Sequence, residues 1–435
     1  MILVYVSNIT PRVRYIFHFI FNDILNIAYD LTSEKQKFEV SDHPRINYSE
    51  TEIVGTVQII PHSLLFETGI KEQAIRVTEW KGTKVFFQTD SKLDVPFDIF
   101  AASFYLLTRY EEYLPHKKDS HGRFLAEESL AFKNDFLEEP VVDQWAFLFA
   151  DDLKQQIPDF KIPERNYQYI PTIDIDVAYA YKYKGFGRTV GAFGKDIVKF
   201  NLIDNHKRIK VLLGLVKDPY DTYDFLEKLH KRYNLAPVFF FLVGRYTKFD
   251  KNHSIKKKEY RELIKKISTG VQVGLHPSYG SNSDYNVLKK EADEFSQLIG
   301  RKVEKSRQHF LKLTLPDTYR NLNKIGIKED YTMGFASKPG FRAGTCTSFH
   351  FYDLENEEQT LLKIFPFQVM DGTLNQYMKL NKEEAMEKIR KIVNSVKFVN
   401  GTFISLWHNE SVGEQREWKG WSDIYEEMLK NCKSE

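Results

Sequence analysis

The sequence predicts an α/β fold for most of this chain. From about residue 164 onward, short apolar runs with strand character alternate with amphipathic helical patterns of about 10–15 residues. Ionisable residues follow the ends of several of these runs, and two prolines mark a change of pattern near residue 160. Such alternation is typical of βαβ units, which build a parallel sheet or a barrel with both faces covered.

The expected elements follow one another in this later part of the chain. About seven strands are expected, one fewer than in the familiar eight-stranded barrel. The expected strands are residues 169–175, 238–243, 271–275, 301–307, 331–335, 365–369 and 401–406. The expected helices lie near residues 222–233, 256–268, 285–299, 315–325 and 382–396.

The first 160 or so residues have a different rhythm, in which short β-rich runs alternate with helical patterns. These runs and patterns are residues 52–60, 74–78, 84–88, 97–114 and 144–156. Before them we expect a strand and a buried helix rather than a signal peptide, because arginines separate the two apolar stretches and no small-residue cleavage site follows. We therefore expect a smaller α+β domain over residues 1–163 and a larger α/β domain over residues 164–435.

Composition limits the classes of partner. The 435 residues include 62 basic and 60 acidic side chains, a net charge of +2, and so lack the large basic excess typical of a nucleic-acid-binding protein. Cys346 and Cys432 form no disulfide framework and indicate free thiols in a reducing compartment. No uncharged apolar run reaches about 18 residues, so no membrane span is expected and the expected location is the cytoplasm. The oligomeric state is left open.

Asp174 and Asp176 stand at the end of the first strand expected in the larger domain. Side chains alternate along a strand, so both carboxylates share one face. Two crowded carboxylates repel each other unless a cation or a shared proton separates them. Arg307, near a later strand end, is expected to hold Asp174 ionised and oriented. A turn or capping role is the alternative for an Asp-x-Asp pair taken alone.

Three histidines, His276, His309 and His408, lie near the ends of later apolar runs. A catalytic zinc site takes three protein ligands from imidazoles and carboxylates and keeps one exchangeable position. Asp176, His276 and His309 supply such a set, which leaves Asp174 as the general base and His408 as the acid for the leaving group. A buried histidine taken singly is more often a hydrogen-bonded core residue. The placement at successive strand ends favours the site.

Together these segments resemble the polysaccharide deacetylase superfamily, the NodB-homology domain of carbohydrate esterase family 4. The resemblance extends over residues 167–421 and does not include the first 160 residues. The similar segments are residues 172–176, 274–278, 307–310, 330–335 and 406–408. The resemblance implies a distorted (β/α)₇ barrel and a metal-dependent deacetylase. It also implies that Arg307 contacts the base Asp174 and that Asp330 orients the catalytic His408.

The sequence departs from the family's pattern at two positions. Gly280 stands where the second motif normally has another histidine, and His309 stands where the third motif normally has proline. We interpret this as a relocated ligand, with one imidazole lost from one loop and another gained at a neighbouring strand end. The alternative is a degenerate site that binds metal poorly or not at all.

The leading hypothesis is a metal-dependent hydrolase that removes an acyl group from the nitrogen of an N-acetylated sugar or glycan precursor. One divalent ion is expected, Zn²⁺ first, with Co²⁺, Mn²⁺ or Ni²⁺ as alternatives. Hydrolysis of another non-peptide amide or cyclic ureide, or a degenerate glycan-binding protein, remains open. The expected partner is thus a carbohydrate or small amide.

Several further residues are candidates for the same pocket. Arg342 lies in a glycine-flanked stretch that fits a simple turn equally well, and Asp371 either lines the pocket or forms a turn. Glu410 is the next candidate for the base. The residues expected to contact substrate are Tyr279, Phe310, Arg342 and Trp407.

Overall fold

The computed structural model describes residues 1–157, 160–198 and 202–433. Residue contacts divide the chain into two compact units. Unit 1 comprises Met1–Gln168, Leu313–Gln368 and Lys391–Phe403, and unit 2 comprises Tyr169–Lys312, Val369–Arg390 and Ile404–Glu435. The units therefore interleave along the chain, whereas the sequence suggested one boundary at residue 163.

Unit 2 is built on mainly parallel strands that carry the candidate site. These strands are β7 (Gln168–Ile175), β8 (Val238–Leu242), β9 (Gln272–His276), β10 (Lys305–Ser306), β14 (Val369–Met370) and β15 (Thr402–His408). Their hydrogen-bonded order is β10-β9-β8-β7-β15-β14, with parallel pairing of β8 to β7 and β9, of β10 to β9, and of β14 to β15. The order is open, because no pairing among the described residues joins its two ends. The described strands thus form a mainly parallel α/β sheet, and the distorted (β/α)₇ barrel that the family resemblance implied stays a prediction.

The central strands are apolar along their whole length. All five residues of β8, Val-Phe-Phe-Phe-Leu, are buried, as expected for a parallel strand covered on both faces. Gly274 in β9 lies so close to its neighbours that a Cβ atom there would be 2.5 Å from the Phe240 ring and 2.9 Å from the Lys305 carbonyl oxygen. Only glycine allows this approach, which brings the ends of β8, β9 and β10 together.

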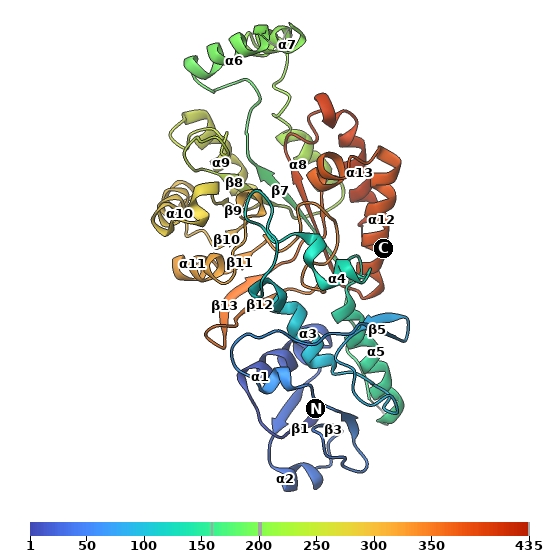
Figure 1. Cartoon of the computed structure of the whole chain (residues 1–435). Coiled ribbons are helices and arrows are strands. Elements are labelled where there is room, and N and C mark those ends of the chain that lie inside the picture. Colours follow the sequence, from blue (N-terminus) through green and yellow to red (C-terminus); the bar gives the residue numbers. More distant parts are fainter. Residues whose placement is uncertain (158–159, 199–201, 434–435) are drawn as a thin grey trace. The chain divides into compact units, whose positions relative to one another are not determined.

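Helices connect these strands. They are α6 (Phe186–Val198), α7 (Leu202–Leu212), α8 (Tyr223–Arg232), α9 (Lys258–Gly270), α10 (Tyr285–Ile299), α12 (Lys382–Phe398) and α13 (Trp421–Asn431). Figure 1 shows α9 and α10 on one side of the strands and α12 and α13 on the other, so the sheet is a middle layer. The expected helices at 222–233, 256–268, 285–299 and 382–396 agree with α8, α9, α10 and α12.

Unit 1 contains a second parallel sheet, which the sequence analysis did not predict as such. Its strand order is β2 (Tyr29–Thr32), β1 (Ile2–Val6), β3 (Arg45–Tyr48) and β4 (Val57–Ile59), and every pairing is parallel. The expected N-terminal strand and buried helix are β1 and α1 (Pro11–His18). The remaining N-terminal elements are α2 (Lys35–Glu39), the hairpin β5 (Thr78–Trp80) and β6 (Thr83–Val85), α3 (Ile99–Leu107), α4 (Leu130–Lys133) and α5 (Val141–Gln156).

Unit 1 also contains a segment from the later part of the chain. This segment carries α11 (Asp317–Ile325), β11 (Glu329–Asp330), β12 (Phe349–Asp353) and β13 (Glu358–Ile364). The Tyr352 ring lies 4.9 Å from that of Tyr15 and 5.2 Å from that of Phe104, and Arg12 Nε donates to Glu357 Oε2 at 2.9 Å. These aromatic and ionic contacts are the reason why residues 313–368 belong with the N-terminal core.

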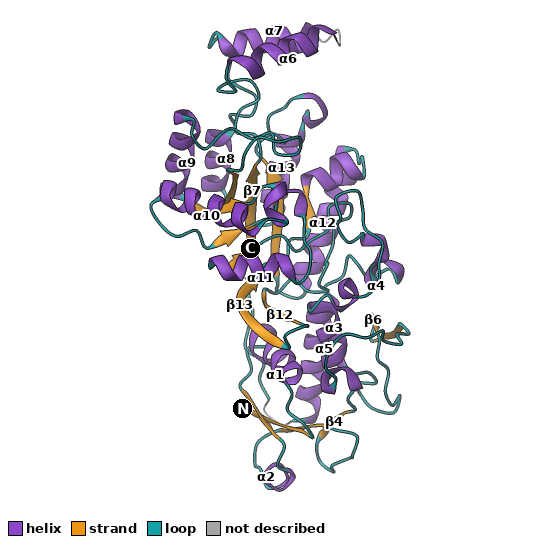
Figure 2. Ribbon diagram, turned by 60° about the vertical axis from the view of Figure 1, so that its left-hand side comes forward, coloured by secondary structure: helices purple, strands orange, loops and turns teal. Residues whose placement is uncertain are grey.

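Two strand predictions are wrong in detail. Residues 331–335 were expected as a strand, but the strand is the pair Glu329–Asp330. Residues 365–369 were expected as another, but the strand is Val369–Met370. The antiparallel hairpin β12–β13 was missed. Figure 2 shows the strands in orange between purple helices. No helix among the described residues is both long enough and apolar enough to cross a bilayer.

Candidate metal centre and active site

Asp174 and Arg307 form a buried ion pair in unit 2. Asp174 belongs to β7, and Arg307 follows β10. Arg307 Nη1 donates to Asp174 Oδ1 at 2.9 Å and to Thr172 Oγ1 at 2.7 Å. The two side chains are 0% and 2% exposed. A charge-assisted bond of this kind, shielded from water, fixes the orientation of the carboxylate.

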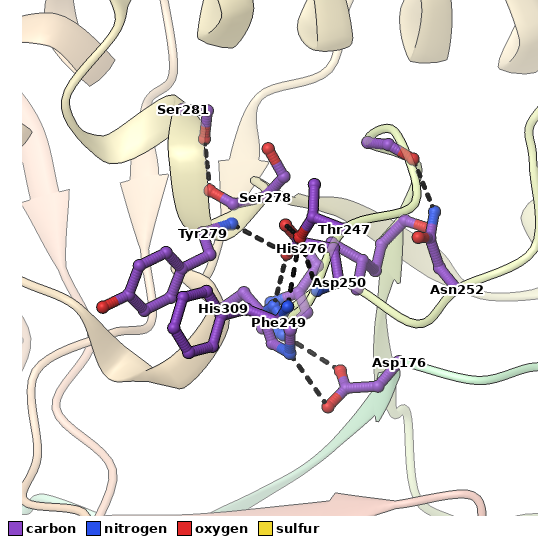
Figure 3. Close-up of polar contacts among 12 residues, drawn as sticks. Asp176, Thr247, Phe249, Asp250, Asn252, His276, Ser278, Tyr279, Ser281 and His309 are labelled. Carbon is purple, nitrogen blue, oxygen red and sulfur yellow. Dashed lines mark hydrogen bonds and ion pairs between the residues drawn. The ribbon is translucent and has the colours of Figure 1, made fainter. Parts of the chain in front are cut away.

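Asp176, His276 and His309 converge at the carboxyl ends of their strands (Figure 3). His276 is the last residue of β9, and its Nε2 lies 3.1 Å from Asp176 Oδ1. His309 Nε2 lies 3.4 Å from Asp176 Oδ2. One ligand atom from each residue lies within 4.8 Å of the others. The structure thus brings together the three residues that the sequence analysis selected as ligands.

The hydrogen bonds of the two imidazoles decide which nitrogens face the centre. His276 Nδ1 lies 2.5 Å from the Arg307 carbonyl oxygen, and His309 Nδ1 lies 2.8 Å from Asp250 Oδ1. Both oxygens can only accept, so each Nδ1–H donates, and in a neutral ring Nε2 then presents a lone pair.

These lone pairs point toward a carboxylate that also needs a partner. Asp176 Oδ1 is buried and has no hydrogen-bond partner. Acceptor atoms that face one another at 3.1 and 3.4 Å require a cation or a proton between them. One carboxylate and two imidazoles are a donor set that suits Zn²⁺ and similar divalent ions, so these side chains fit a metal.

The electrostatics of the cluster favour positive charge at the same place. Burial alone would raise the pKa of Asp176, but His309 and His276 lower it well below its ordinary value. Burial would lower the pKa of His309, but Asp176 and Asp250 raise it to about 9. A divalent cation supplies this positive charge without a proton.

Asp250 is a site residue that the sequence analysis missed. Its buried carboxylate accepts from His309 Nδ1 and from the Tyr279 backbone N–H, both at 2.8 Å, and from Thr247 Oγ1 at 2.7 Å. A carboxylate behind a ligating histidine fixes the ring and its tautomer. The available signal was a Thr-x-x-Asp turn shortly after the strand expected at residues 238–243.

His408, the last residue of β15, is oriented by Asp371. Asp371 Oδ1 lies 2.8 Å from His408 Nδ1, and Asp371 Oδ2 accepts from the His408 backbone N–H at 2.8 Å. The assignment of this role to Asp330 is therefore wrong: Asp330 belongs to unit 1, where it accepts from the backbone N–H and the hydroxyl of Thr332. The loose match at residues 330–335 identified a carboxylate in a different unit.

Burial and neighbouring charges shift the pKa values of both His408 and Glu410. Burial would lower the pKa of His408, but Asp371, Asp176 and Asp174 raise it well above its ordinary value. His408 Nε2 lies 3.8 Å from Asp176 Oδ2. Burial raises the pKa of Glu410 to about 7, with Asp176 and Asp371 adding to the rise and His408 opposing it. His408 therefore favours the protonated form, as a general acid needs.

An aromatic group lies beside His309. Half-buried Tyr279 stacks on Phe249 with ring centroids 4.1 Å apart, and the Phe310 ring lies 4.6 Å from His309 and 5.4 Å from Tyr279. Lys312 Nζ lies 4.4 Å from the centre of the Tyr279 ring. Tyr279 and Phe310 are thus partly exposed next to the candidate metal centre, and their contact with a substrate stays a prediction.

Trp407 and Arg342 do not have the substrate-contacting positions that the sequence analysis assigned. Trp407 is 0% exposed and packs on Tyr425 and Trp421 at 4.8 and 5.9 Å, because its side chain points away from the face that carries His408. Arg342 is buried in unit 1, where its Nη2 lies 2.6 Å from Glu112 Oε2. Both residues stabilise cores.

The space beside the Cα atom of Gly280, where a Cβ atom would lie, is unoccupied by other residues. It lies in the short 3₁₀ helix Tyr279–Asn282, and a Cβ atom there would have no neighbour within 4 Å. Gly280 supplies no side chain at the position where the resemblance would place a histidine. On the next loop, His309 points its Nε2 at the Asp176 carboxylate.

Comparison with protein families gives one match outside the site. Residues 2–158 match a model described as a family of unknown function (DUF7033). No curated protein matches the chain. The matched segment ends before β7, so it includes none of the candidate site residues.

Several solved structures are similar to the chain at low identity. A provisionally assigned polysaccharide deacetylase from Mycobacterium smegmatis has a TM-score of 0.41 and 14% identity, with 63% of this chain and 86% of that chain covered. A polysaccharide deacetylase from Bacillus cereus has a TM-score of 0.30 and 13% identity, covering 61% and 88%. A CE4 family pseudoenzyme from Bacillus anthracis has a TM-score of 0.31 and 11% identity, covering 63% and 66%.

Proposed function

We propose that this chain is a metal-dependent hydrolase of a non-peptide carbon–nitrogen bond, and that its substrate is an N-acetylated sugar or glycan precursor. The observation that supports the proposal best is the convergence of Asp176, His276 and His309 between an ion-paired carboxylate, Asp174, and an imidazole, His408, whose pKa the neighbouring carboxylates raise. The motif resemblance adds the substrate class and the distorted (β/α)₇ barrel as the fold.

The roles follow from the chemistry of amide hydrolysis. Water adds to the acyl carbon, the carbon–nitrogen bond breaks, the acyl group leaves as a carboxylic acid, and the nitrogen leaves as an amine with a new proton. A divalent ion held by Asp176, His276 and His309 would lower the pKa of water and polarise the acyl carbonyl.

The remaining residues transfer protons. Asp174 keeps Oδ2 available while Arg307 engages Oδ1, so Asp174 can take the proton of the attacking water. His408 donates the proton that the departing amine requires, and Asp371 holds its ring through Nδ1 so that Nε2 carries this proton. Base and acid are thus different groups, each fixed by its own buried partner.

Metal content and acetate release test this proposal together. Purified protein should hold about one divalent ion per chain, measured by plasma mass spectrometry, and should release acetate from a panel of N-acetylated sugars and their oligomers. Asp176→Ala and His309→Ala should lose both the ion and the activity, whereas His43→Ala, at an exposed histidine elsewhere, should lose neither.

Two results would contradict the proposal. A metal-loaded structure in which His309 Nε2 lies well outside the bonding range of about 2.0–2.1 Å would remove the relocated ligand. Stoichiometric metal without hydrolysis of any N-acetylated sugar would favour a cyclic amide or ureide substrate, and a chain that binds no metal would be a degenerate glycan-binding protein.

A further inference from the structure

Exposed apolar side chains are concentrated in the segment that joins β7 to α8. Among the described residues, seventeen large hydrophobic side chains are exposed, and eight of these lie between residues 183 and 216. They are Tyr183, Phe186, Val190, Ile209, Leu212, Leu213, Leu215 and Val216, with exposed fractions from 40% to 87%. Single exposed hydrophobic residues are ordinary, but a concentration of this kind marks an interaction surface.

Helix α7 carries both buried and exposed side chains among its described residues. Its buried residues recur with helical spacing and are Asp204, Asn205, Arg208 and Val211. Arg416 pairs with Asp204, and Arg208 lies 5.3 Å above the Tyr181 ring, so this face is held against the rest of unit 2. Ile209 and Leu212 in the same helix, and Leu213 directly after it, are exposed. Figures 1 and 2 show α6 and α7 side by side.

The same segment is basic. Residues 176–222, which join β7 to α8, contain nine lysines and arginines and five aspartates, a net charge of +4, although the whole chain carries only +2. One of the five aspartates, Asp204, is already paired with Arg416. Lys210 is exposed and Lys207 is half-buried, and both lie close in sequence to the exposed leucines. The eight exposed hydrophobic side chains with Lys207 and Lys210 are called the apolar–basic surface below.

We propose that the apolar–basic surface docks onto an anionic lipid bilayer. Its bulky aliphatic and aromatic side chains would enter the interface, and its lysines would meet the lipid phosphates. Basic residues that flank exposed apolar ones are the pattern of a segment that lies on a membrane without crossing it. A second copy of this chain is a poorer occupant, because like surfaces with this charge repel each other.

The apolar–basic surface begins a few residues after Asp176, so docking would affect the position of the candidate site. Only residues 177–182 separate Asp176 from Tyr183, so a docked surface keeps the carboxyl end of β7 close to the bilayer. That consequence matters for catalysis only if the proposed function holds. The docking itself does not depend on it and is tested without any activity measurement.

Vesicle co-sedimentation of the full chain tests the proposal. We expect at least about tenfold more protein to sediment with phosphatidylcholine vesicles containing about 30% phosphatidylglycerol than with phosphatidylcholine alone. Binding should weaken as the salt concentration rises from about 0.05 M to about 0.5 M, because the screening length shortens. Equal sedimentation with both vesicle types, or with neither, overturns the proposal.

Paired variants separate the apolar from the charged contribution. L212S/L213S should weaken binding about tenfold or more, and K207E/K210E should do the same. The matched controls L361S/F398S, at side chains 84% and 79% exposed elsewhere, and K256E/K257E, at exposed lysines, should bind as the parent does. All variants should keep the parent's thermal midpoint.

Two further outcomes would overturn the proposal, and the second would identify another occupant. If L212S/L213S binds anionic vesicles as tightly as the parent, the apolar side chains do not enter lipid and the proposal is wrong. If sedimentation velocity shows a dimer that L212S/L213S abolishes, while no vesicles bind, the occupant is a second copy of the chain.

Discussion

The molecule contains two buried charge clusters of similar size and opposite character. In unit 1, Arg109 and Arg342 surround Glu112, with Arg109 Nε 2.7 Å from Oε1 and Arg342 Nη2 2.6 Å from Oε2. In unit 2, two imidazoles and a carboxylate face one another through atoms that all accept when the rings are neutral. Sequence patterns drew attention to residues of both clusters, Arg342 in one and Asp176 in the other.

The difference lies in whether the hydrogen-bonding capacity is filled. Arg109 reaches Glu112, Glu111 and the Arg342 carbonyl oxygen, and Arg342 reaches Glu112 and the Gly334 carbonyl oxygen. Both guanidinium groups therefore use all three nitrogens. A filled cluster of this kind fixes a structure, whereas Asp176 Oδ1, buried without a partner, is an unfilled position suited to an ion.

Asp174→Asn should give the largest effect and leaves the metal centre in place. The amide keeps the shape of the side chain but cannot take a proton from water, so kcat should fall by about 10²–10⁴-fold while metal content is unchanged. Asp293→Asn, at an exposed ion pair with Lys289, is the matched control and should have wild-type kcat. Near-normal activity of Asp174→Asn would transfer the base role to Glu410.

Glu112→Gln should act on stability instead. Loss of the carboxylate leaves the buried Arg342 guanidinium without its counter-charge and Arg109 with Glu111 alone, which should lower the free energy of unfolding by about 3–5 kcal/mol. Glu127→Gln, in a surface pair 3.9 Å from Lys338, should lower it by less than about 1 kcal/mol. Chemical denaturation measures both.

The pH dependence of the same cluster sharpens this contrast. Burial would raise the pKa of Glu112, but Arg342 and Arg109 lower it to about 2, so its stabilising contribution is present above the ordinary glutamate pKa and is lost as pH falls toward 2. The Glu112→Gln variant should therefore lose less stability than the parent between about pH 5 and pH 2. A parallel loss in both proteins would contradict the filled-cluster interpretation.

Local patterns in the sequence were sufficient for the elements that carry the site. The all-apolar run of β8 and the amphipathic helices α9 and α10 were predicted because burial on both faces, or on one stripe, leaves a direct periodic signal. The Asp174–Asp176 spacing and the three strand-end histidines are local signals of the same kind.

Features that depend on tertiary contacts were not predictable in this way. Asp371 and Asp330 are both aspartates near short strands, and only the pairing of β14 with β15 makes Asp371 the neighbour of His408. Trp407 and His408 are adjacent in sequence but point to opposite faces of β15. If His408 faces the candidate site, Trp407 therefore cannot contact a substrate there. Residues 313–368 join unit 1 through contacts of Tyr352 and Glu357, which no periodicity reveals.

Asp371→Asn should move a pH profile rather than abolish activity. Because Asp371 raises the pKa of His408, the protonated acid persists to higher pH, and activity is lost as pH rises through that pKa. The asparagine variant should shift the alkaline limb of the kcat profile to lower pH and lower kcat by about tenfold, with metal content unchanged. Asp330→Asn is the control and should leave this limb in place; a shift there instead would return the orienting role to Asp330.

Asp250→Asn should have the smallest effect, on metal affinity alone. The amide oxygen can still accept from His309 Nδ1, but the negative charge that strengthens the imidazole as a ligand is gone, so affinity for Zn²⁺ should fall by about 10–100-fold. The matched control is Asp218→Asn, because buried Asp218 accepts only from backbone N–H groups, of Ala180, Tyr181, Lys182 and Tyr220, among the bonds seen here. That variant should lose stability but bind Zn²⁺ as the parent does. Competition with a chromogenic chelator measures both affinities, and equal affinities for the two variants would mean that Asp250 only shapes its loop, like the filled cluster of unit 1.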